Sequence, residues 1–558
     1  MARNISRKVF IIFLFAALFF VLAGSGIYKK YFRGISPAIF APPKDIAEYL
    51  PEDTVPSEAI NETNFPLKLP DGFTISIFAK NLAGARVMRF DTFGNMWVSR
   101  TGKGAITLLE IDRGTGKVLH QDDIFNGLRK PHGLAFDPNN PFLLYIAEEN
   151  RVRRITVYSD DLGEDVLSLP LGEGHFTRTI GFGPDNKLYI SVGSSCNVCN
   201  EEIERRASII QYDIQTKISK IFAKGLRNAI FFVWNGSTSS PQDGLTRLTA
   251  NNGYKAQNEM WVTEMGRDWL GDNLPPDEIN IIRDSSINSE QNSIPNFGWP
   301  ICYGKNIHDT DFDKNTYIRN PCMEPFELPS FIDIPAHSAP LGLAFVSNGT
   351  HSIGSGQAWP EDYWYDLLVA YHGSWNRSDP IGYKVVRHKF DANGNYQGVE
   401  DFITGWLVQE GALGRPVDII FNSKGEMFLS DDKAGVIYKI IYQSGKPRVG
   451  DKSNLIKVKT PLPGKIVKSP LVIEGEARGN WFFEASFPVR LVDGNSKEIF
   501  RGHAEALSEW MTTDFVPFRA TLEFKMPDTA SGELILEKDN PSGLPENYDE
   551  LRIPIRFR

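Results

Sequence analysis

A strand, a tight turn and a second strand recur six times along this chain, and this repeat restricts its fold more than any other feature. The repeats begin near Val87, His132, Thr179, Ala229, Leu341 and Val417. Most turns carry Gly, Asn or Asp, as in VMRFDTFGNMWVSR, and a further strand-like segment such as ITLLEID follows each repeat. Because a lone twisted sheet leaves both faces uncovered, sheets of this size bury them by stacking around an axis. The chain is therefore predicted to be all-β, with a six-bladed β-propeller as its main domain.

Composition shifts divide the chain into five parts. The repeats occupy residues 67–443, after a spacer at 35–66 that is rich in proline and acidic residues. A polar linker at 444–462 leads to a new alternating β pattern over 463–558, which contains no cysteine. Its length and strand spacing predict a small immunoglobulin-like β-sandwich.

The first 34 residues form a separate segment. Three basic residues precede an apolar run from Val9 to Tyr28, which matches the roughly 20 residues that a helix needs to cross a bilayer. Small residues at 22–26 offer a cleavage point, whereas Lys29 and Lys30 follow directly. Both a membrane anchor and a cleaved signal peptide stay open. Either one predicts export, with the chain facing the periplasm or the cell exterior, anchored or secreted.

Four cysteines fit an exported protein. Cys196 and Cys199 form a CxxC, and Cys302 and Cys322 flank a polar loop, so two local disulfides are predicted in an oxidising compartment. The CxxC is followed by Asn200 rather than histidine, which disfavours covalent haem attachment. A four-cysteine zinc site would need a second closely spaced pair.

Polar residues just before the first strand of a blade are the candidate functional residues, because such positions converge on the axis of a propeller. Five successive repeats place the following residues there: His132; His175 with Arg178; Arg227 with Asn228; His337; and Arg415. Any one of them alone is more often an ordinary loop residue. Together, arginines among neutral histidines would bind a flat ligand with several carboxylates. A histidine held neutral by nearby cations also suits a general base.

Net charge and one acidic loop bear on the other ligands. The net charge of −9, without a large basic run, excludes a nucleic-acid partner and leaves small neutral substrates open. The loop TEMGRDWLGDNLPPDEIN offers hard oxygen ligands for Ca²⁺, including Asp277. A solvated acidic loop is the other interpretation of this stretch.

Several segments together carry a family resemblance that spans Leu69 to Tyr442. They are GHFTRTIGFGPDNKLYISVGSSCNVC, GLRN, WVTEMGRDWLGDNLPPDEIN, NFGWPICYG, HSAPLGL, YHGSWNRSDPIGYKVVR and GRPVDIIFNSKGEMFLSDDKAGVIYKI. In this order they resemble the sorbosone dehydrogenase branch of the soluble PQQ-dependent sugar dehydrogenases. The resemblance implies a six-bladed propeller that oxidises a sugar, an aldose or ketoaldose, with PQQ as hydride acceptor and Ca²⁺ as its activating ion.

The resemblance also implies roles for single residues. His175 matches the general base, and Arg227 and Asn228 match the pair at the quinone oxygens. Arg415 matches an arginine that pairs with PQQ carboxylates, and the Ca²⁺ ligands would be backbone carbonyls of the loop with Gly266 and Arg267, near Asp277. The further cofactor contacts expected are His132, Arg178, His337, His372 and Arg377. The stretch YHGSWNRSDP departs from the cofactor loop of the glucose enzymes, which puts His372 and Arg377 in doubt.

The tail resembles the Gmad2 domain, an immunoglobulin-like module of bacterial exported proteins, through GEARGNWFFEASFPVRLVD and DFVPFRATLEF. This implies binding or spacing at the cell surface, with Trp481, Phe482 and Phe483 either as core or as an exposed patch for a glycan or protein. Without a CxxCH haem site in the chain, electrons would pass to an external acceptor. Two other functions stay open: a propeller that only binds surface glycans or proteins, and a Ca²⁺-dependent lactonase.

Overall fold

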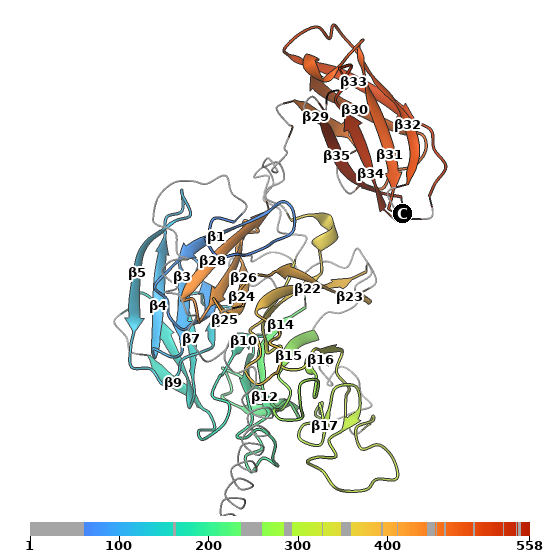
Figure 1. Cartoon of the computed structure of the whole chain (residues 1–558). Coiled ribbons are helices and arrows are strands. Elements are labelled where there is room, and N and C mark those ends of the chain that lie inside the picture. The colour runs from blue at the N-terminus through green and yellow to red at the C-terminus, as the bar shows by residue number, and fades with distance from the viewer. Residues whose placement is uncertain are drawn as a thin grey trace, which may run out of the picture. The chain divides into compact units, whose positions relative to one another are not determined.

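A computed structural model describes residues 61–557, apart from 160–162, 236–258, 284–292, 326, 347–358, 392–393, 410, 443–451, 453–454, 462–464, 495–496, 528, 530, 543 and 545–547. The chain separates into two compact units, Met1–Ser444 and Gly445–Arg558 (Figure 1). The predicted anchor or signal segment at 1–34 and most of the spacer lie outside the described residues. Within the described ranges, no helix is long and apolar enough to span a membrane.

The first unit is a propeller of six four-stranded antiparallel sheets, as the repeat predicts. The first three blades are β2–β5 (Ala85–Phe90, Met96–Arg100, Ala105–Ile111, Val118–Phe125), β6–β9 (Leu134–Phe136, Leu143–Glu148, Arg151–Thr156, Glu164–Ser168) and β10–β13 (Ile180–Phe182, Leu188–Val192, Ser208–Tyr212, Ser219–Lys224). The others are β14, β15, β16 and β19 (Ala229–Trp234, Glu259–Glu264, Asp277–Arg283, Ile332–Ile334); β20–β23 (Pro340–Phe345, Leu367–Tyr371, Lys384–Phe390, Tyr396–Ile403); and β26–β28 (Pro416–Phe421, Met427–Asp431, Val436–Tyr442) with β1 (Phe73–Ala79). Short additions are β17 and β18 (Cys302–Tyr303, Ile307–His308), β24 and β25 (Leu407–Val408, Gly411–Ala412) and the 3₁₀ turn η4 (Glu361–Tyr363).

The inner strands of neighbouring blades contact one another around the axis. Two glycines permit this close approach. A Cβ on Gly133 would lie 2.5 Å from the carbonyl oxygen of Arg178, and one on Gly342 would lie 2.5 Å from that of Val417. Either contact is too short for any side chain, so glycine is required where the inner strands converge.

Strand β1 closes the ring. It comes first in the chain yet pairs antiparallel with β28, the last strand of the propeller, with Phe73 opposite Tyr442. Phe73 is fully buried, and its ring makes edge contacts with Trp359, Tyr363 and Phe402, with centroids 4.7 to 5.2 Å apart. Closure thus rests on backbone pairing and on an aromatic cluster that joins the last two blades.

The second unit holds β29–β35 in one connected antiparallel sheet, ordered β29-β30-β33-β32-β31-β34-β35. These strands are Ile456–Thr460, Leu471–Arg478, Ser486–Asp493, Glu498–Ala506, Phe515–Leu522, Ser531–Glu537 and Glu550–Arg556, with the 3₁₀ turn η5 at Gly479–Trp481. Only two residue pairs join β32 to β33, so the sheet folds there into two halves around a shared core. Trp481 and Phe482 belong to this core, and Phe483 alone of the three is exposed. The aromatic patch at these positions is therefore reduced to one residue.

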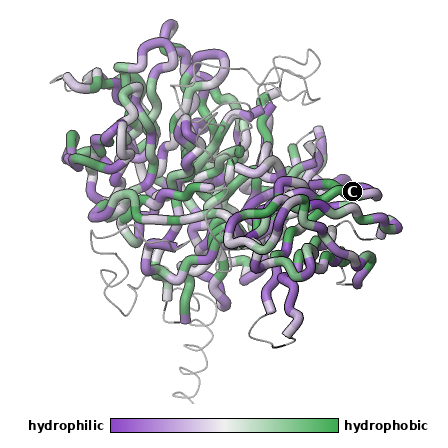
Figure 2. Tube along the Cα trace, turned by 90° about the horizontal axis from the view of Figure 1, so that it is seen from above, coloured by the Kyte–Doolittle hydropathy of each residue, from purple (hydrophilic) through white to green (hydrophobic). Residues whose placement is uncertain are grey.

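Hydropathy follows this architecture. Strands β3, β11 and β27 are buried at every position, which is expected for strands that are covered on both faces. Along the trace, hydrophilic stretches gather at many of the turns (Figure 2). Polar residues that could bind a ligand are therefore expected at the strand ends and in the loops rather than within the strands.

Replacement of Phe73 by alanine tests the closure. Removal of a fully buried phenylalanine costs about 3–5 kcal/mol of unfolding free energy, so F73A is expected to lower the propeller's unfolding transition strongly in calorimetry. The matched control F483A removes an exposed ring and is expected to change stability little. An unchanged propeller transition in F73A would contradict this account of closure.

Candidate functional site

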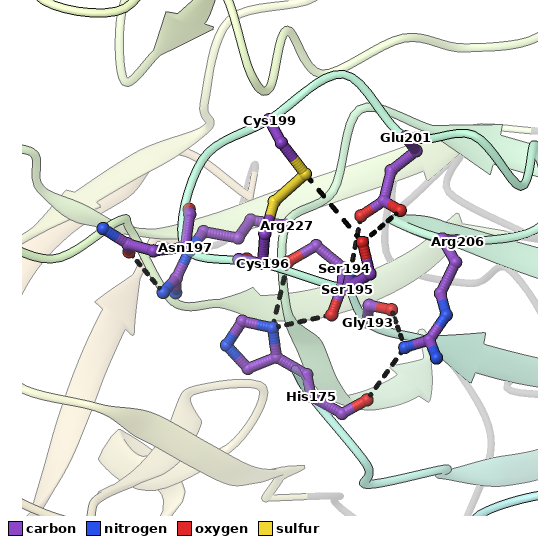
Figure 3. Close-up of a disulfide and its surroundings, with 10 residues drawn as sticks. All are labelled: His175, Gly193, Ser194, Ser195, Cys196, Asn197, Cys199, Glu201, Arg206 and Arg227. Atoms are coloured by element: carbon purple, nitrogen blue, oxygen red, sulfur yellow. Dashed lines mark hydrogen bonds between the residues drawn. A yellow bond between two sulfur atoms is a disulfide. The ribbon is translucent and has the colours of Figure 1, made fainter. Parts of the chain in front are cut away.

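His175 lies before β10, where the third blade begins, and its ring is held by Ser194 just beyond β11. Nδ1 lies 3.1 Å from the Ser194 carbonyl oxygen and 2.9 Å from its Oγ (Figure 3). The carbonyl can only accept, and Ser194 Oγ already donates to the Cys196 carbonyl oxygen at 2.6 Å. Nδ1 must therefore carry the proton and donate to both oxygens. Nε2 is left with its lone pair, and no described residue hydrogen-bonds to it.

The surroundings keep the His175 ring neutral. Burial lowers its pKa to about 3, and the nearby Arg227, Arg178 and Arg206 cations act in the same direction. Gly193 makes the close packing possible, because a Cβ there would lie 2.6 Å from the His175 Cβ and 2.8 Å from Asn228 Oδ1. His175 is thus a rigid neutral imidazole with one basic nitrogen.

Arg227 lies beside His175, before β14, and is almost fully buried. Nε and Nη2 donate to the carbonyl oxygen and Oδ1 of Asn197, both at 2.8 Å. Nη1 donates to the carbonyl oxygens of Met265 and Gly266 at 3.2 and 2.9 Å, and Nη2 also donates to Asp268 at 3.1 Å. All five N–H groups therefore have acceptors. Direct contact with a quinone oxygen would require one of these bonds to open, whereas the charge of Arg227 acts in any case.

The loop between β15 and β16 brings the predicted metal-binding residues to the same place. The carbonyl oxygens of Met265 and Gly266 face Arg227, and Gly266 N donates to Asp277 Oδ1 at 2.9 Å. Asp277 Oδ2 accepts from Ala339 N at 2.8 Å, which ties the loop to the next blade. The Arg267 side chain turns away to pair with Asp309 at 2.8 Å.

Three carboxyl groups near this loop are buried. Burial raises the pKa of Asp277 and Glu278 to about 7 and that of Glu264 well above its usual range. Glu264 Oε1 accepts from Asn228 N at 2.9 Å, while its Oε2 is buried without a hydrogen-bond partner. A cation nearby would satisfy this oxygen.

A second cluster joins the last blades to the first. Arg415 Nε donates to the His372 carbonyl oxygen at 3.0 Å, and its Nη2 donates to that of Gly373. His372 Nε2 lies 2.9 Å from Asp432 Oδ1, and Arg86 binds the other oxygen at 2.6 Å. Burial and Arg415 lower the pKa of His372 to about 4, and the His372 and Arg86 partners hold that of Asp432 low despite burial.

His337 and Arg377 hydrogen-bond to the C-terminal part of the loop between β15 and β16. His337 Nε2 lies 2.8 Å from the Gly271 carbonyl oxygen, and Arg377 donates to the carbonyl oxygen of Asp272 and to Asn273 Oδ1. These contacts fix the conformation of the loop at residues 271–273. Next to it lies a hollow of about 460 Å³ lined by Trp269, Leu270, Gly271, Asp272, Asp311, Asn376 and Ser378.

The hollow and the His175 region meet at one carboxylate. Asp268 pairs with Arg227 and accepts from Asn376 Nδ2 at 2.7 Å. Trp269, the next residue, is 51% exposed. Hydrogen bonds through Asp268 thus link Asn376 of the hollow to Arg227.

Two predicted cofactor contacts lie inside the propeller. His132 is fully buried, packs against Phe231 and has Nδ1 3.2 Å from Thr179 Oγ1. Arg178 is also fully buried and donates to the carbonyl oxygens of His175, Thr177 and Pro170. Both groups support the inner strands and the His175 loop.

Disulfides join Cys196 to Cys199 and Cys302 to Cys322. The acidic groups beside them, Glu201 and Glu327, are close enough to suggest metal sites, but the bonded sulfur atoms rule out thiolate ligation.

Sequence reasoning missed Arg86, Ser194, Asn197 and Asp432. Arg86 could have been found, because it stands immediately before Val87, where the first repeat begins. The other three act through loops whose paths no local pattern shows.

Comparisons with known proteins match two parts of the chain to known families. Residues 67–443 match the family described as TrAA12-like, and residues 455–543 match the immunoglobulin-like domain of bacterial spore germination, Gmad2. An uncharacterised protein of Borreliella burgdorferi is 29% identical over 409 residues, which cover 70% of this chain and 94% of that protein. A pyrroloquinoline quinone-dependent pyranose dehydrogenase of Coprinopsis cinerea is 24% identical over 457 residues, 69% of this chain but only 56% of that enzyme.

Solved structures share the propeller fold. The calcium structure of the Trichoderma reesei family AA12 protein has a TM-score of 0.55 at 20% identity, covering 68% of this chain and 98% of that one. The holo PQQ domain of the Coprinopsis cinerea pyranose dehydrogenase has a TM-score of 0.52 at 19% identity, covering 68% and 97%. Because the family match spans more than half of the chain, the protein belongs to the TrAA12-like family, among the relatives of PQQ-dependent sugar dehydrogenases, and carries a C-terminal Gmad2 domain.

Proposed function

We propose that this protein oxidises a sugar hydroxyl or aldehyde hydrate with PQQ and Ca²⁺, and that His175 is the general base. The observation that carries the proposal is the His175 ring, whose proton is fixed on Nδ1 and whose Nε2 lone pair is free. A neutral base next to a fixed cation suits the removal of a proton from an alcohol. Family membership supports sugar oxidation as the reaction class.

The described residues fit both groups. The carbonyl oxygens of Met265 and Gly266 and the unpartnered Oε2 of Glu264 are hard oxygen donors of the kind Ca²⁺ prefers. Arg227, which is nearly fully buried, would supply positive charge at the quinone oxygens, and the half-buried Arg415 would supply it for the carboxylates of PQQ. When bound, PQQ with Ca²⁺ would supply the two-electron acceptor for the hydride from the sugar.

The chain's own residues would handle the proton and the charge. His175 Nε2 takes the proton of the sugar hydroxyl, and the proton on Nδ1 stays bonded to Ser194. The imidazolium that forms is stabilised by the two Ser194 oxygens but opposed by Arg227, so it is short-lived and returns its proton readily. An external acceptor must then reoxidise the cofactor, because the chain contains no haem-attachment motif.

We place the sugar ring in the hollow beside Trp269. Its lining combines an exposed aromatic face with Asp272, Asp311, Asn376 and Ser378, which can exchange hydrogen bonds with sugar hydroxyls. Two carboxylates and no cation in this lining disfavour an anionic ligand such as PQQ. Asp268, which bonds both to Asn376 of the lining and to Arg227, links this hollow to the cation beside the proposed base and supports this position.

Purified protein mixed with PQQ, with and without Ca²⁺, gives the direct test. We expect a thermal shift with PQQ that grows with Ca²⁺ and dye reduction with an aldose or ketoaldose. Binding without turnover of any sugar would favour a binding propeller, and lactone hydrolysis with Ca²⁺ alone would favour a lactonase.

His175→Ala removes the proposed base. Loss of general base catalysis is expected to lower kcat by roughly 10²- to 10⁴-fold, with the PQQ-induced thermal shift retained. The control His120→Ala removes an exposed histidine of β5 and is expected to leave kcat unchanged. Full activity in H175A would exclude His175 as the base.

The lowered pKa of His175 predicts the acid limb of the pH-rate profile. A base whose pKa is about 3 rather than 6.5 stays neutral at pH 5, so kcat/KM is expected to hold to about pH 4 and fall only below it. Stability behaves accordingly: between pH 6.5 and about 3 the unfolded chain binds more protons at this residue, so folding stability from His175 falls as the pH falls through this window. An acid limb near pH 6.5 would contradict the burial argument.

Trp269→Ala tests the sugar position. Loss of the aromatic face is expected to raise KM for the sugar about tenfold with a smaller change in kcat and an unchanged PQQ shift. Trp269→Phe keeps an aromatic face and should restore most of the affinity. An unchanged KM in W269A would move the sugar elsewhere.

A further inference from the structure

The loop closed by the Cys196–Cys199 disulfide bonds to both residues at the centre of the site. It follows β11 and Ser194 and contains no regular secondary structure. Glu201 closes its outer side by accepting from Ser195 N at 2.6 Å and from Ser195 Oγ at 2.8 Å. Its inner side carries Asn197, which lies between the two cysteines and faces Arg227 (Figure 3).

Asn197 joins this loop to Arg227 and to the β15–β16 loop. Its carbonyl oxygen and Oδ1 accept from Arg227 Nε and Nη2, both at 2.8 Å. Oδ1 also accepts from Asp268 N at 2.8 Å, and Nδ2 donates to the Asp268 carbonyl oxygen at 3.1 Å. Asn197 therefore holds two N–H groups of the guanidinium, one through its backbone and one through its side chain, and the same side chain pins the loop whose carbonyl oxygens hold Nη1.

The same loop sets the tautomer of His175. The Cys196 carbonyl oxygen accepts a hydrogen bond from Ser194 Oγ, so this hydroxyl can only accept from His175 Nδ1. If Cys196 moved, Ser194 Oγ could donate to Nδ1 instead, and only the Ser194 carbonyl oxygen would still favour the proton on Nδ1 over Nε2. The disulfide-closed loop thus fixes both the basic nitrogen and the neighbouring cation.

We propose that Asn197, held between Cys196 and Cys199 by their disulfide, is a positioning residue that orients Arg227 and, with Cys196, keeps His175 in its basic form. The inference rests on the proposed function for its effect on turnover. Its geometric part concerns only residues of this chain and does not need a bound cofactor.

The two disulfides predict opposite effects. The Cys196–Cys199 bridge spans three residues and is half-buried, so it restrains little of the unfolded chain. The Cys302–Cys322 bridge spans 20 residues and is buried, so it restrains much more. Loss of the first should therefore affect catalysis more than stability, and loss of the second the reverse.

Asn197→Ala and Asn197→Asp test the side chain. N197A removes both Oδ1 contacts and is expected to lower kcat at least tenfold while KM for the sugar changes less than threefold. N197D keeps an oxygen for Arg227 and Asp268 N and should restore most of kcat. Equal kcat in wild type and N197A, or no recovery in N197D, would overturn the proposal.

A second measurement needs no cofactor or turnover. Arg227, Arg178 and Arg206 are the cations that face His175, and only Arg227 is held by Asn197. In the cofactor-free protein, an NMR titration of His175 should show a higher pKa in N197A than in wild type, because Arg227 is less well held. An unchanged His175 pKa in N197A would overturn the positioning role of Asn197. A wild-type protein that neither binds PQQ nor oxidises sugars would refute the proposed function alone and would leave this pKa test valid.

The double variants C196S/C199S and C302S/C322S complete the test. We expect the first to lose kcat as N197A does with a small change in Tm, and the second to lose Tm with kcat retained at a temperature where it is folded. Equal loss of both quantities in the two variants would show a merely structural bridge and overturn the proposal.

Discussion

The pairing of β1 with β28 is the constraint on which the rest of the propeller depends. Each blade buries its faces only against its neighbours, so an open ring would leave two sheets uncovered. Closure also brings Arg86 of the first blade against Asp432 of the last, where His372 binds the other oxygen. The polar cluster therefore exists only because the two ends of the propeller sequence share one sheet.

Electrostatics at the centre follows from burial more than from the number of charges. Arg227 is nearly fully buried and Arg415 is half-buried, and backbone carbonyl oxygens accept three N–H groups of Arg227 and two of Arg415. Burial alone would make such cations costly, and these oriented carbonyls offset part of the cost. The same fixed charges keep His175 neutral, so the features that stabilise the arginines also prepare the base.

The fold could be read from the sequence because its information is local. A turn between two strands is visible in a dozen residues, and six repeats fix the number of blades. The convergence of His175, Arg227 and Asn228 followed from their equal position in successive repeats. The position of a residue in the repeat could not show, however, in which direction its side chain points. Arg178 occupies such a position and points into the propeller wall, where three carbonyl oxygens accept its N–H groups.

Asn197 shows the opposite limit. Nothing in CNVC distinguishes its asparagine from a loop residue, because its partners lie 30 and 71 residues further along the chain. Residues that orient catalytic groups act through such distant contacts. They become visible only when the loops are placed in space.

Closure by β1 also has a consequence for biosynthesis. Phe73 is made early, but its partner Tyr442 is nearly the last propeller residue to be added. Until then the ring is open, the hydrophobic edges of the first and last blades face solvent, and the growing chain is exposed to misassembly. The Arg86–Asp432 pair, which joins the first blade to the last, therefore forms only at the end of propeller synthesis, and a chain truncated before β28 would lack this closure.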